Sequence, residues 1–358
     1  MTQPQLLPIP ISAGGPITYL LLAVGSFAVS YLFSYFLVPR LKRAGIIGND
    51  VNKPDKPEVA EMGGFSIIAG FTAGVLLAVF FNTFFSYNFD LVKVLAALIT
   101  IHSIAFIGVV DDLISIPQRI KAFLPLVAAV PLVAVKAAGS TAILVPFFGT
   151  IDFGLAYTLL LIPLGVAVAS NLTNMLAGFN GMEAGMGSII FAAMTLLAFN
   201  NGSVEMLVLF VPMLGALLGF LPFNLFPARV FPGDVGNLSI GAVLAAGVII
   251  GNIEGAGAFI LSLYIIDFFI KLKNRFPSRD WWGEIRTEKG VKVQSGVKSE
   301  IGAIWSGVKL HPVGGKVRGF AQFIMKLHNG ATELRLVACF VAMQIVVAML
   351  VLLAYWKW

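Results

Sequence analysis

The sequence predicts an all-α polytopic membrane protein with about ten transmembrane helices. Three observations carry this prediction: 58% of the 358 residues are hydrophobic, only 12% are charged, and the mean hydropathy is +0.92. About a quarter of the residues in a soluble domain are charged, so this chain lacks the polar side chains to cover a water-exposed surface. The composition excludes a soluble enzyme, a nucleic-acid-binding protein and a disordered chain. A transporter, a channel and a membrane-embedded enzyme remain.

Ten apolar runs approach or reach the length of about 17–25 residues that crosses the hydrocarbon core of a membrane. In chain order they cover residues 16–38, 64–81, 91–110, 121–139, 154–170, 183–199, 204–220, 235–251, 256–272 and 333–356. Several runs are short, so nine and eleven spans are the alternatives. We expect one membrane domain over residues 1–358, with residues 273–332 as a long mixed segment before the last helix. Within it, Ile285–Val293 alternates as a small hairpin would.

The charged side chains assign the two faces of the membrane. With residues at span ends counted to the nearer face, 21 of the 24 Lys and Arg fall on the face of the loops at 39–63, 111–120, 171–182, 221–234 and 273–332. Without the long segment the ratio is still 8 to 3, so the positive-inside rule places this face in the cytoplasm and both termini outside. The same face holds 14 of the 18 acids. Chemistry is therefore expected there.

The first polar cluster on this face is Asp111-Asp112 with Lys121 ten residues further on. Adjacent carboxylates repel each other and need a cation or a proton nearby. The alternative is a solvated helix end, and the pair alone does not decide between the two.

The second cluster runs from Asn171 to Glu183 and includes Asn174, Gly178 and Asn180. Asn and Gly are turn residues, but this polar stretch is much longer than one turn. Uncharged oxygen donors suit Mg²⁺, which is bound through few carboxylates and keeps several waters. We favour a functional site over an ordinary turn.

Three further groups lie in the remaining loops. Asp234, in the segment Arg229–Asn237, is the only acid of its loop, and its alternative role is a helix N-cap. Lys273 and Arg275 follow a span directly, where a lipid-headgroup anchor is as good an explanation as anion binding. Glu61 lies in the first loop, which by itself is a plain connector.

Together these clusters bring acids, neutral oxygens and basic residues to one face. That inventory fits a divalent metal with phosphate groups, and thus an enzyme at the membrane surface. A channel would need polar residues along its spans, and these spans are nearly free of them. The main exceptions are Asp267 and His102, and we expect His102 to be packed or hydrogen-bonded inside the bundle.

Three segments, in this order along the chain, resemble the polyprenyl-phosphate N-acetylhexosamine-1-phosphate transferase superfamily: DDLISIPQRIK, NLTNMLAGFNGMEAG and FPGDVGN. The AGFNGMEAG stretch is most similar to the UDP-GlcNAc:dolichyl-phosphate GlcNAc-1-phosphate transferases, which begin N-glycan assembly. Bacterial branches usually carry acids where this chain has Ala177 and Asn180, and they carry a histidine-rich motif that is absent here.

The resemblance implies roles for the residues near the reacting phosphates. Asn174 and Asp234 match the positions that coordinate Mg²⁺, for which Mn²⁺ is a substitute. Asp111 and Asp112 match the paired acids, and Lys121 matches a lysine that contacts phosphate.

The resemblance also implies roles in substrate binding. Phe231 matches the aromatic residue that stacks on uracil, and Gly178 and Asn180 match the nucleotide pocket. Lys273 and Arg275 resemble the basic pair on the pyrophosphate and sugar, although Asn274 and Ser115 stand where relatives carry His and Asn. Glu61 resembles an acid near the lipid phosphate.

The implied reaction transfers GlcNAc-1-phosphate from UDP-GlcNAc to a polyprenyl or dolichyl phosphate and releases UMP, the first step of lipid-linked oligosaccharide assembly. The alternatives are transfer of another HexNAc-1-phosphate for cell-envelope glycans, and a transporter of nucleotide sugars or lipids. Expected partners are these substrates, membrane lipids and a second copy of the chain, but no nucleic acid. Expected locations are the cell membrane, as in archaea, or the endoplasmic reticulum membrane.

Overall fold

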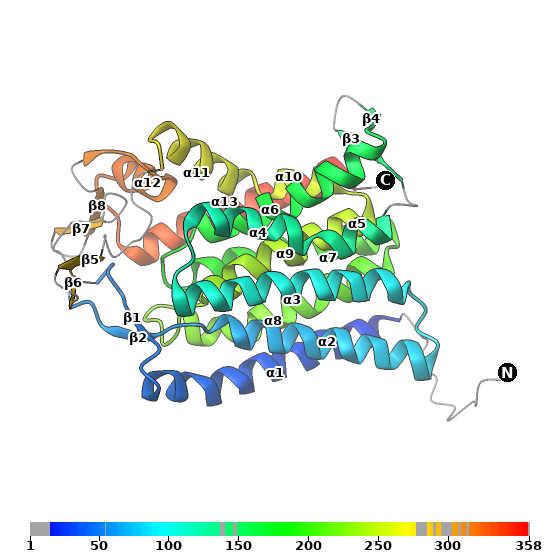
Figure 1. The fold of residues 1–358 in the computed structure, drawn as a ribbon, viewed down its shortest axis with the longest axis horizontal. Coiled ribbons are helices and arrows are strands. Elements are labelled where there is room, and N and C mark those ends of the chain that lie inside the picture. Colours follow the sequence, from blue (N-terminus) through cyan, green and yellow to red (C-terminus); the bar gives the residue numbers. More distant parts are fainter. Residues whose placement is uncertain are drawn as a thin grey trace.

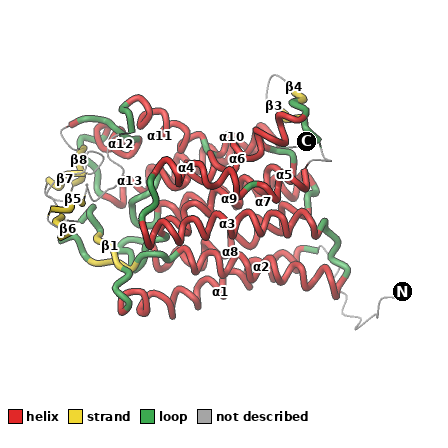
Figure 2. The backbone as a smooth tube through the Cα atoms, viewed as in Figure 1, coloured by secondary structure: helices red, strands yellow, loops and turns green. Residues whose placement is uncertain are grey.

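The computed structural model describes residues 15–53, 55–136, 140–145, 149–276, 285–288, 291–294, 303–306, 309–312 and 315–356. It is a bundle of long helices that run side by side, with short strands confined to the two ends (Figures 1 and 2). The elements in chain order are α1 (Pro16–Arg43), β1 (Ile47–Asn49), β2 (Glu58–Ala60), α2 (Gly64–Phe85), α3 (Leu91–Ile114), α4 (Gln118–Ala128), α5 (Val130–Lys136), β3 (Ala142–Val145), β4 (Gly149–Asp152), the π-helical turn η1 (Tyr157–Leu161), α6 (Ile162–Met175), α7 (Met182–Asn201), α8 (Val204–Asn224), α9 (Gly233–Gly251), α10 (Glu254–Ile260), α11 (Ser262–Lys273), β5 (Ile285–Glu288), β6 (Val291–Gln294), β7 (Ala303–Ser306), β8 (Lys309–Pro312), α12 (Phe320–Leu327) and α13 (Glu333–Tyr355).

The predicted spans are confirmed. Within the described residues, 9 helical segments are long and apolar enough to cross a membrane, and α10 with α11 makes a tenth if this pair, bent by 63°, is one span. The predicted run 121–139 is a span that begins at Gln118 and breaks between α4 and α5. Pro131 explains the break because it has no amide hydrogen for a helical hydrogen bond.

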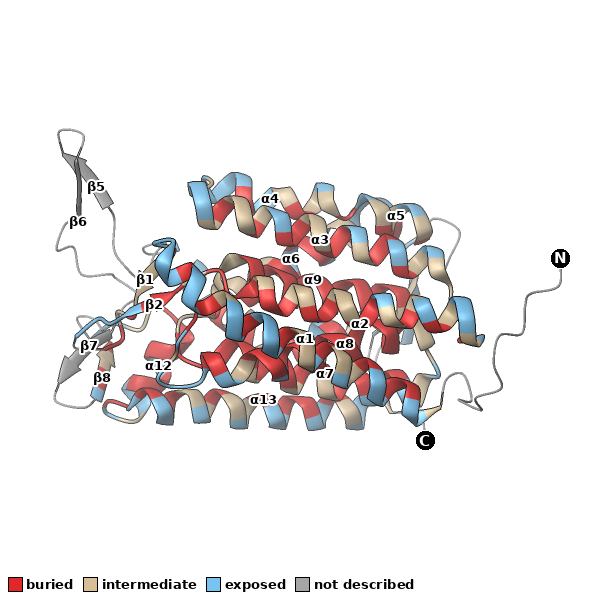
Figure 3. Cartoon of the chain, turned by 90° about the horizontal axis from the view of Figure 1, so that it is seen from below, coloured by how far each residue is buried: buried red, intermediate tan, exposed pale blue. Residues whose placement is uncertain are grey.

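The bundle is layered around α9. Its span is 89% buried, whereas the span of α1 is 22% buried and exposes apolar side chains such as Leu20 and Val24. Figure 3 shows the same division, with buried residues along the inner helices and exposed residues on the outer ones. Apolar side chains on the outside of a helical bundle are stable only against lipid, which agrees with a multi-pass membrane protein.

Glycines bring α2 and α3 into contact with the first turn of α9. A Cβ atom on Gly64 would lie 2.1 Å from the backbone nitrogen of Gly236, and one on Gly108 would lie 2.6 Å from the backbone nitrogen of Val235. Small residues allow such close helix approach in membranes. These two contacts fix where α9 begins relative to the polar end of α3.

The two ends of the bundle differ. The hairpins β1–β2, β5–β6 and β7–β8 and the short helix α12 lie at one end, and β3–β4 lies at the other, as do the first turn of α1 and the last turn of α13 (Figure 1). The hairpin predicted at Ile285–Val293 is confirmed as β5–β6, in which Ile285 pairs with Gln294. The polar motifs of the predicted site all lie at or near the first of these ends.

Candidate active site

Lys121 joins two of the predicted acidic motifs. Its Nζ atom lies 2.6 Å from Oδ2 of Asp111 and also forms an ion pair with Asp234. Lys121 and Asp111 are both buried, and Asp234 is partly buried. The structure therefore brings together residues from α3, α4 and α9 that lie up to 123 positions apart. One cation compensates two carboxylates that would otherwise repel each other.

The short turn between α3 and α4 brings Lys121 close to Asp111. Ser115 adopts a left-handed backbone conformation with φ of 53° and ends α3. The amide of Ile116 then donates to Oδ1 of Asp111 at 2.6 Å. Because α4 begins at Gln118, Lys121 lies on its first turn and points back at Asp111.

The Asp112 side chain caps the N-terminus of α9. Its carboxylate accepts hydrogen bonds from the backbone amides of Asp234 at 3.0 Å and Val235 at 3.4 Å. Amides at a helix N-terminus lack helical partners and attract negative charge. Gly233 adopts φ of +64°, and a Cβ atom there would lie 2.6 Å from Oδ2 of Asp112. The alternative role of Asp234 as N-cap is wrong: Asp112 takes that place, and the Asp234 side chain turns to Lys121.

Asn174 lies at the end of α6, beside the start of α9. The neighbouring Thr173 hydroxyl donates to the backbone oxygen of Asn237 at 2.8 Å, which ties the two helix ends together. The Asn174 side chain is partly exposed and makes no hydrogen bond to any described residue. The Oδ1 atom of Asn237 is buried and also lacks a partner among those residues. Two carboxamides are thus available near Asp234.

These donors suit a metal ion that depends on its substrate for further ligands. Among the described residues, no group of three His, Cys, Asp or Glu side chains could hold a metal by itself. Mg²⁺ does not need such a group, because it commonly uses one or two carboxylates together with substrate phosphates and waters. Asp234 and Asn174 fit a partial site of this kind. Their roles as magnesium ligands stay a prediction.

Glu61 lies near the set formed by Asp111, Asp112, Lys121 and Asp234, which we call the Asp111–Asp234 group. Burial, with a contribution from the negative charge of Asp112, raises the pKa of its carboxyl group. Its carboxylate covers Gly48, where a Cβ atom would collide with Oε1. The structure therefore places the predicted first-loop acid within the electrostatic reach of Asp112.

Phe231 is held by the strand that precedes α2. Its backbone amide donates to the Ala60 oxygen at 2.8 Å, and its own oxygen accepts from the Gly63 amide at 2.8 Å. These bonds fix the residue three positions before Asp234, with a partly exposed side chain. An aromatic face there is compatible with base stacking, which stays a prediction.

Asn180 has a structural environment that the sequence did not reveal. Its side-chain amide donates to Asp50 at 2.9 Å, its side-chain oxygen accepts from the Ala228 amide at 2.8 Å, and its backbone amide donates to Glu333 at 2.8 Å. Lys53 forms ion pairs with Asp50, at 2.9 Å, and with Glu333. We call Asp50, Lys53, Asn180 and Glu333 the Asn180 cluster.

Gly178, a further residue predicted to bind the nucleotide, lies two positions before Asn180 and is also held by polar side chains. The Gly178 amide donates to Glu183 at 2.6 Å, and its oxygen accepts from the Asn52 side chain at 2.6 Å. Gly178 has φ of +118°, a conformation that few residues other than glycine adopt. Sequence reasoning missed Asn52, Lys53 and Glu333 as partners. The only available signal was the polar segment GNDVNK inside a connector.

Lys273 is the last residue of α11, and Arg275 follows two positions later. Both are exposed, and within the described part of the chain neither forms a hydrogen bond or ion pair with the Asp111–Asp234 group. The preceding basic residue, Lys271, is instead buried, pairs with Asp267 at 2.7 Å and donates to the Met175 oxygen at 2.5 Å. Lys271 is therefore the basic residue of α11 that reaches the end of α6, and its spacing of four from Asp267 was the signal for it.

The chain is similar in sequence to known proteins over the part that holds these residues. The family described as "Glycosyl transferase family 4" matches residues 94–252, a range that contains Asp111, Lys121, Asn174 and Asp234. A protein of Saccharolobus solfataricus named as a UDP-N-acetylglucosamine–dolichyl-phosphate N-acetylglucosaminephosphotransferase is 36% identical over 70% of this chain and 77% of its own length. A protein of the same name from Sulfolobus acidocaldarius is 34% identical over 72% and 78%. A phospho-N-acetylmuramoyl-pentapeptide-transferase of Shouchella clausii is 30% identical over 70% and 80%.

Proposed function

This chain belongs to glycosyl transferase family 4, and on that premise we propose that it transfers GlcNAc-1-phosphate from UDP-GlcNAc to a polyprenyl or dolichyl phosphate, releasing UMP. The observation that carries the proposal is the meeting of Asp111, Lys121 and Asp234 at one end of the bundle. The names of two relatives support GlcNAc over another HexNAc.

The reaction forms one phosphorus–oxygen bond and breaks another. An oxygen of the acceptor phosphate attacks the β-phosphorus of UDP-GlcNAc, and the bridging oxygen leaves with UMP. A phosphate monoester has its second pKa near about 6, so the acceptor is mostly ionised at neutral pH. Asp111 and Asp112 therefore do not need to act as strong bases. We assign them to positioning: Asp111 orients Lys121, and Asp112 holds the start of α9.

Lys121 and the carboxamides orient the diphosphate. Lys121 already sits between two carboxylates, so a phosphoryl oxygen can replace one of them without leaving a buried cation unpaired. When bound at Asn174 and Asp234, Mg²⁺, or Mn²⁺ in its place, would neutralise charge on the diphosphate. Phe231, Gly178 and Asn180 are assigned to the nucleotide side, Lys273 and Arg275 to the pyrophosphate and sugar, and Glu61 to the acceptor phosphate.

The excess of Lys and Arg in the loops at this end supports a cytoplasmic active site with both termini outside. The substrates would then meet at the cytoplasmic membrane surface, where a soluble nucleotide sugar and a membrane-held lipid phosphate both have access.

Purified protein in lipid nanodiscs tests the proposal. With Mg²⁺, UDP-GlcNAc and a polyprenyl phosphate we expect equal amounts of UMP and lipid-linked GlcNAc phosphate. Parallel reactions with UDP-GalNAc identify the sugar. Absence of UMP release with every UDP-HexNAc would exclude the enzyme, and uptake of UDP-GlcNAc into sealed vesicles without UMP release would identify a transporter.

A further inference from the structure

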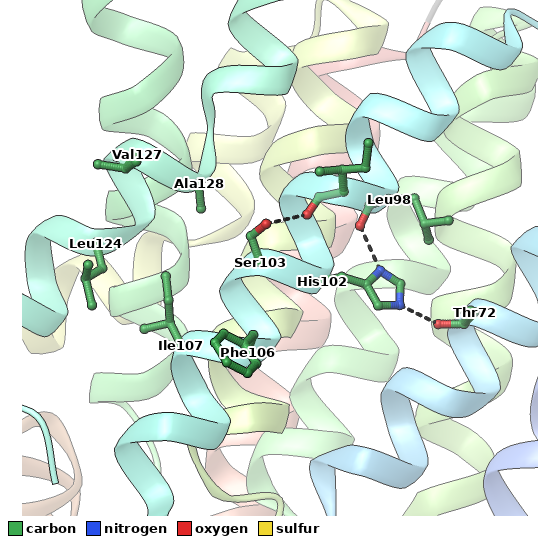
Figure 4. Close-up of a pocket in the computed structure, with 10 residues that line it drawn as sticks. Thr72, Leu98, His102, Ser103, Phe106, Ile107, Leu124, Val127 and Ala128 are labelled. Atoms are coloured by element: carbon green, nitrogen blue, oxygen red, sulfur yellow. Dashed lines mark hydrogen bonds between the residues drawn. The ribbon is translucent and has the colours of Figure 1, made fainter. Parts of the chain in front are cut away.

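His102 lies inside α3 and Asp267 inside α11, and the proposed reaction uses neither side chain. Ionisable residues inside membrane spans are costly to bury and commonly mark functional positions. The bonds of His102 are local: its Nδ1 donates to the Leu98 oxygen at 2.7 Å, and its Nε2 pairs with the Thr72 hydroxyl at 3.0 Å (Figure 4). They confirm that His102 is hydrogen-bonded in the bundle, and they join only α2 and α3.

Asp267 instead connects three separate segments of the chain through Lys271. Its Oδ2 atom pairs with Nζ of Lys271 at 2.7 Å, one turn further along α11. Its Oδ1 atom accepts at 2.8 Å from the amide of Phe320, the first residue of α12. Lys271 donates at 2.5 Å to the backbone oxygen of Met175, the last residue of α6. The ion pair therefore links α11 to the start of α12 and to the end of α6.

The two outer bonds of this pair are made to helix ends. Asp267 and Lys271 are both buried, and a buried ion pair is stable only when further hydrogen bonds satisfy its remaining polar atoms. The Phe320 amide and the Met175 oxygen supply these bonds. Both are backbone groups that have no partner within their own helices. An anion at the start of α12 and a cation at the end of α6 also match the signs of the two helix dipoles.

The end of α6 carries the carboxamide that is predicted to hold Mg²⁺. Asn174 directly precedes Met175, and its side chain bonds to no described residue, so the backbone sets where the carboxamide lies. On the α9 side, the Thr173 hydroxyl holds this backbone by donating to the Asn237 oxygen at 2.8 Å. On the α11 side, Lys271 holds it at the next carbonyl after Asn174.

We propose that Asp267 and Lys271 are positioning residues that fix the Asn174 carboxamide for metal binding, an inference that rests on the proposed function. Asp267 compensates the charge of Lys271 and holds its ammonium group in place. Lys271 in turn holds the last carbonyl of α6. Because Asp267 also binds the first amide of α12, the pair joins the segment before the last helix to the predicted metal ligand.

Binding of Mn²⁺ to the full-length protein in nanodiscs tests the proposal without turnover. The probe is Mn²⁺ with UDP-GlcNAc and no acceptor lipid, and free Mn²⁺ is measured by electron paramagnetic resonance. The variant combines Asp267→Asn with Lys271→Met, which removes both charges together and keeps a side-chain oxygen for the Phe320 amide. We expect the Kd for Mn²⁺ to rise about tenfold, as when a residue that orients a metal ligand is removed. The midpoint of thermal unfolding should stay close to that of the wild type, because no buried charge is left unpaired.

Lys136→Met is the matched control. Lys136 is also buried and also donates to an uncharged oxygen, that of the Asn252 side chain, but it lies at the end of α5, toward the opposite end of the bundle (Figure 1). Its removal should leave the Kd for Mn²⁺ unchanged. An unchanged Kd in the folded Asp267→Asn, Lys271→Met variant would overturn the proposal, as would an equal rise in Lys136→Met.

A cycle with Asn174→Ala separates positioning of the carboxamide from a general structural role. Asn174→Ala alone should weaken Mn²⁺ binding, and the added change of Asp267 and Lys271 should then alter the Kd by less than about twofold, because the pair acts through Asn174. A further tenfold rise would show that the pair acts elsewhere. Wild-type Mn²⁺ binding by Asn174→Ala would reject the metal assignment and the inference with it. Lack of UMP release by a wild-type protein that binds Mn²⁺ would instead reject the proposed transfer, while the effect of the pair on Mn²⁺ binding would still be measured.

Discussion

At the scale of single residues, the site depends on compensated charge. Lys121 separates Asp111 from Asp234, and Asp112 is bound by the first amides of α9, so each carboxylate has a specific partner. Removing one member of a buried charged group leaves the others uncompensated, which costs about 3–5 kcal/mol. Asp112 and Asp234 also fix the start of α9, because Asp112 binds its first amides and Asp234 belongs to its first turn.

The Lys121→Met variant should therefore lose both turnover and stability. We expect at least about a hundredfold lower UMP release and a lower midpoint of thermal unfolding, because two carboxylates then face each other without a cation. The matched control is Lys93→Met, since Lys93 pairs with Asp90 at a site where both side chains are more than a third exposed. Exposed pairs contribute less than about 1 kcal/mol. Turnover of Lys121→Met within tenfold of wild type would refute the role of Lys121.

Gly233 offers a test of the Asp112 contact. Alanine at a left-handed position costs about 1–2 kcal/mol, and in Gly233→Ala the new methyl group would also push against the Asp112 carboxylate. We expect turnover of Gly233→Ala to fall at least about tenfold below that of Gly202→Ala, which carries the same backbone cost of about 1–2 kcal/mol without a contact to Asp112. Gly202→Ala is the control, because Gly202 has nearly the same φ, +65°, and open space around it. Equal activities of the two variants would show that the Asp112 contact does not matter.

At the scale of elements, the helices were predictable and several contacts were not. A run of apolar residues must form a helix in a membrane, so the spans follow from composition, and α1 merely continues to Arg43 where its charged end leaves the hydrocarbon. The approach of Lys121 to Asp111 follows from a short turn. Lys53 and Glu333 are 280 positions apart, and their pairing depends on how the last helix packs against the bundle, which no local spacing encodes.

The Asn180 cluster should behave as one unit. Lys53 joins the first loop to the start of α13, and Asn180 joins both to the loop before α9. In a double-mutant cycle of Lys53→Met and Glu333→Gln, each single change should destabilise the protein. The double variant should cost less than their sum by about 0.5–3 kcal/mol. The measurement is thermal or denaturant unfolding in detergent micelles, with UMP release recorded in parallel. Strict additivity would mean that the two residues act separately.

At the scale of the whole molecule, the charge distribution predicts the orientation. The hairpin β1–β2 and the end of α3 lie at one end of the bundle, and β3–β4 lies at the other (Figure 1). The family relationship confirms the resemblance carried by the three sequence motifs. The hydrogen bonds of Asn180 could not be predicted from the sequence, because an asparagine is equally suited to contact a ligand and to bond several buried groups of the protein.

Cysteine labelling tests the orientation. The chain has one cysteine, Cys339, so Cys339→Ser gives a background for single reporters. Lys56→Cys and Thr150→Cys place exposed thiols at opposite ends of the bundle. A membrane-impermeant maleimide should label Thr150→Cys in intact cells, and Lys56→Cys only after permeabilisation. The reverse pattern would place the candidate site outside the cell.

The central claim is that transfer occurs where α3, α4 and α9 meet, and Asp234→Asn tests it most directly. The measurement is UMP release from UDP-GlcNAc with polyprenyl phosphate and Mg²⁺, beside Glu205→Gln, which changes an acid at the opposite end of the bundle, where Glu205 accepts from the Asp90 amide. We predict that Asp234→Asn retains less than about 1% of wild-type turnover, a loss typical of removing a group that stabilises transition-state charge, and that Glu205→Gln stays close to wild type. Turnover of a folded Asp234→Asn protein within tenfold of wild type would contradict the account.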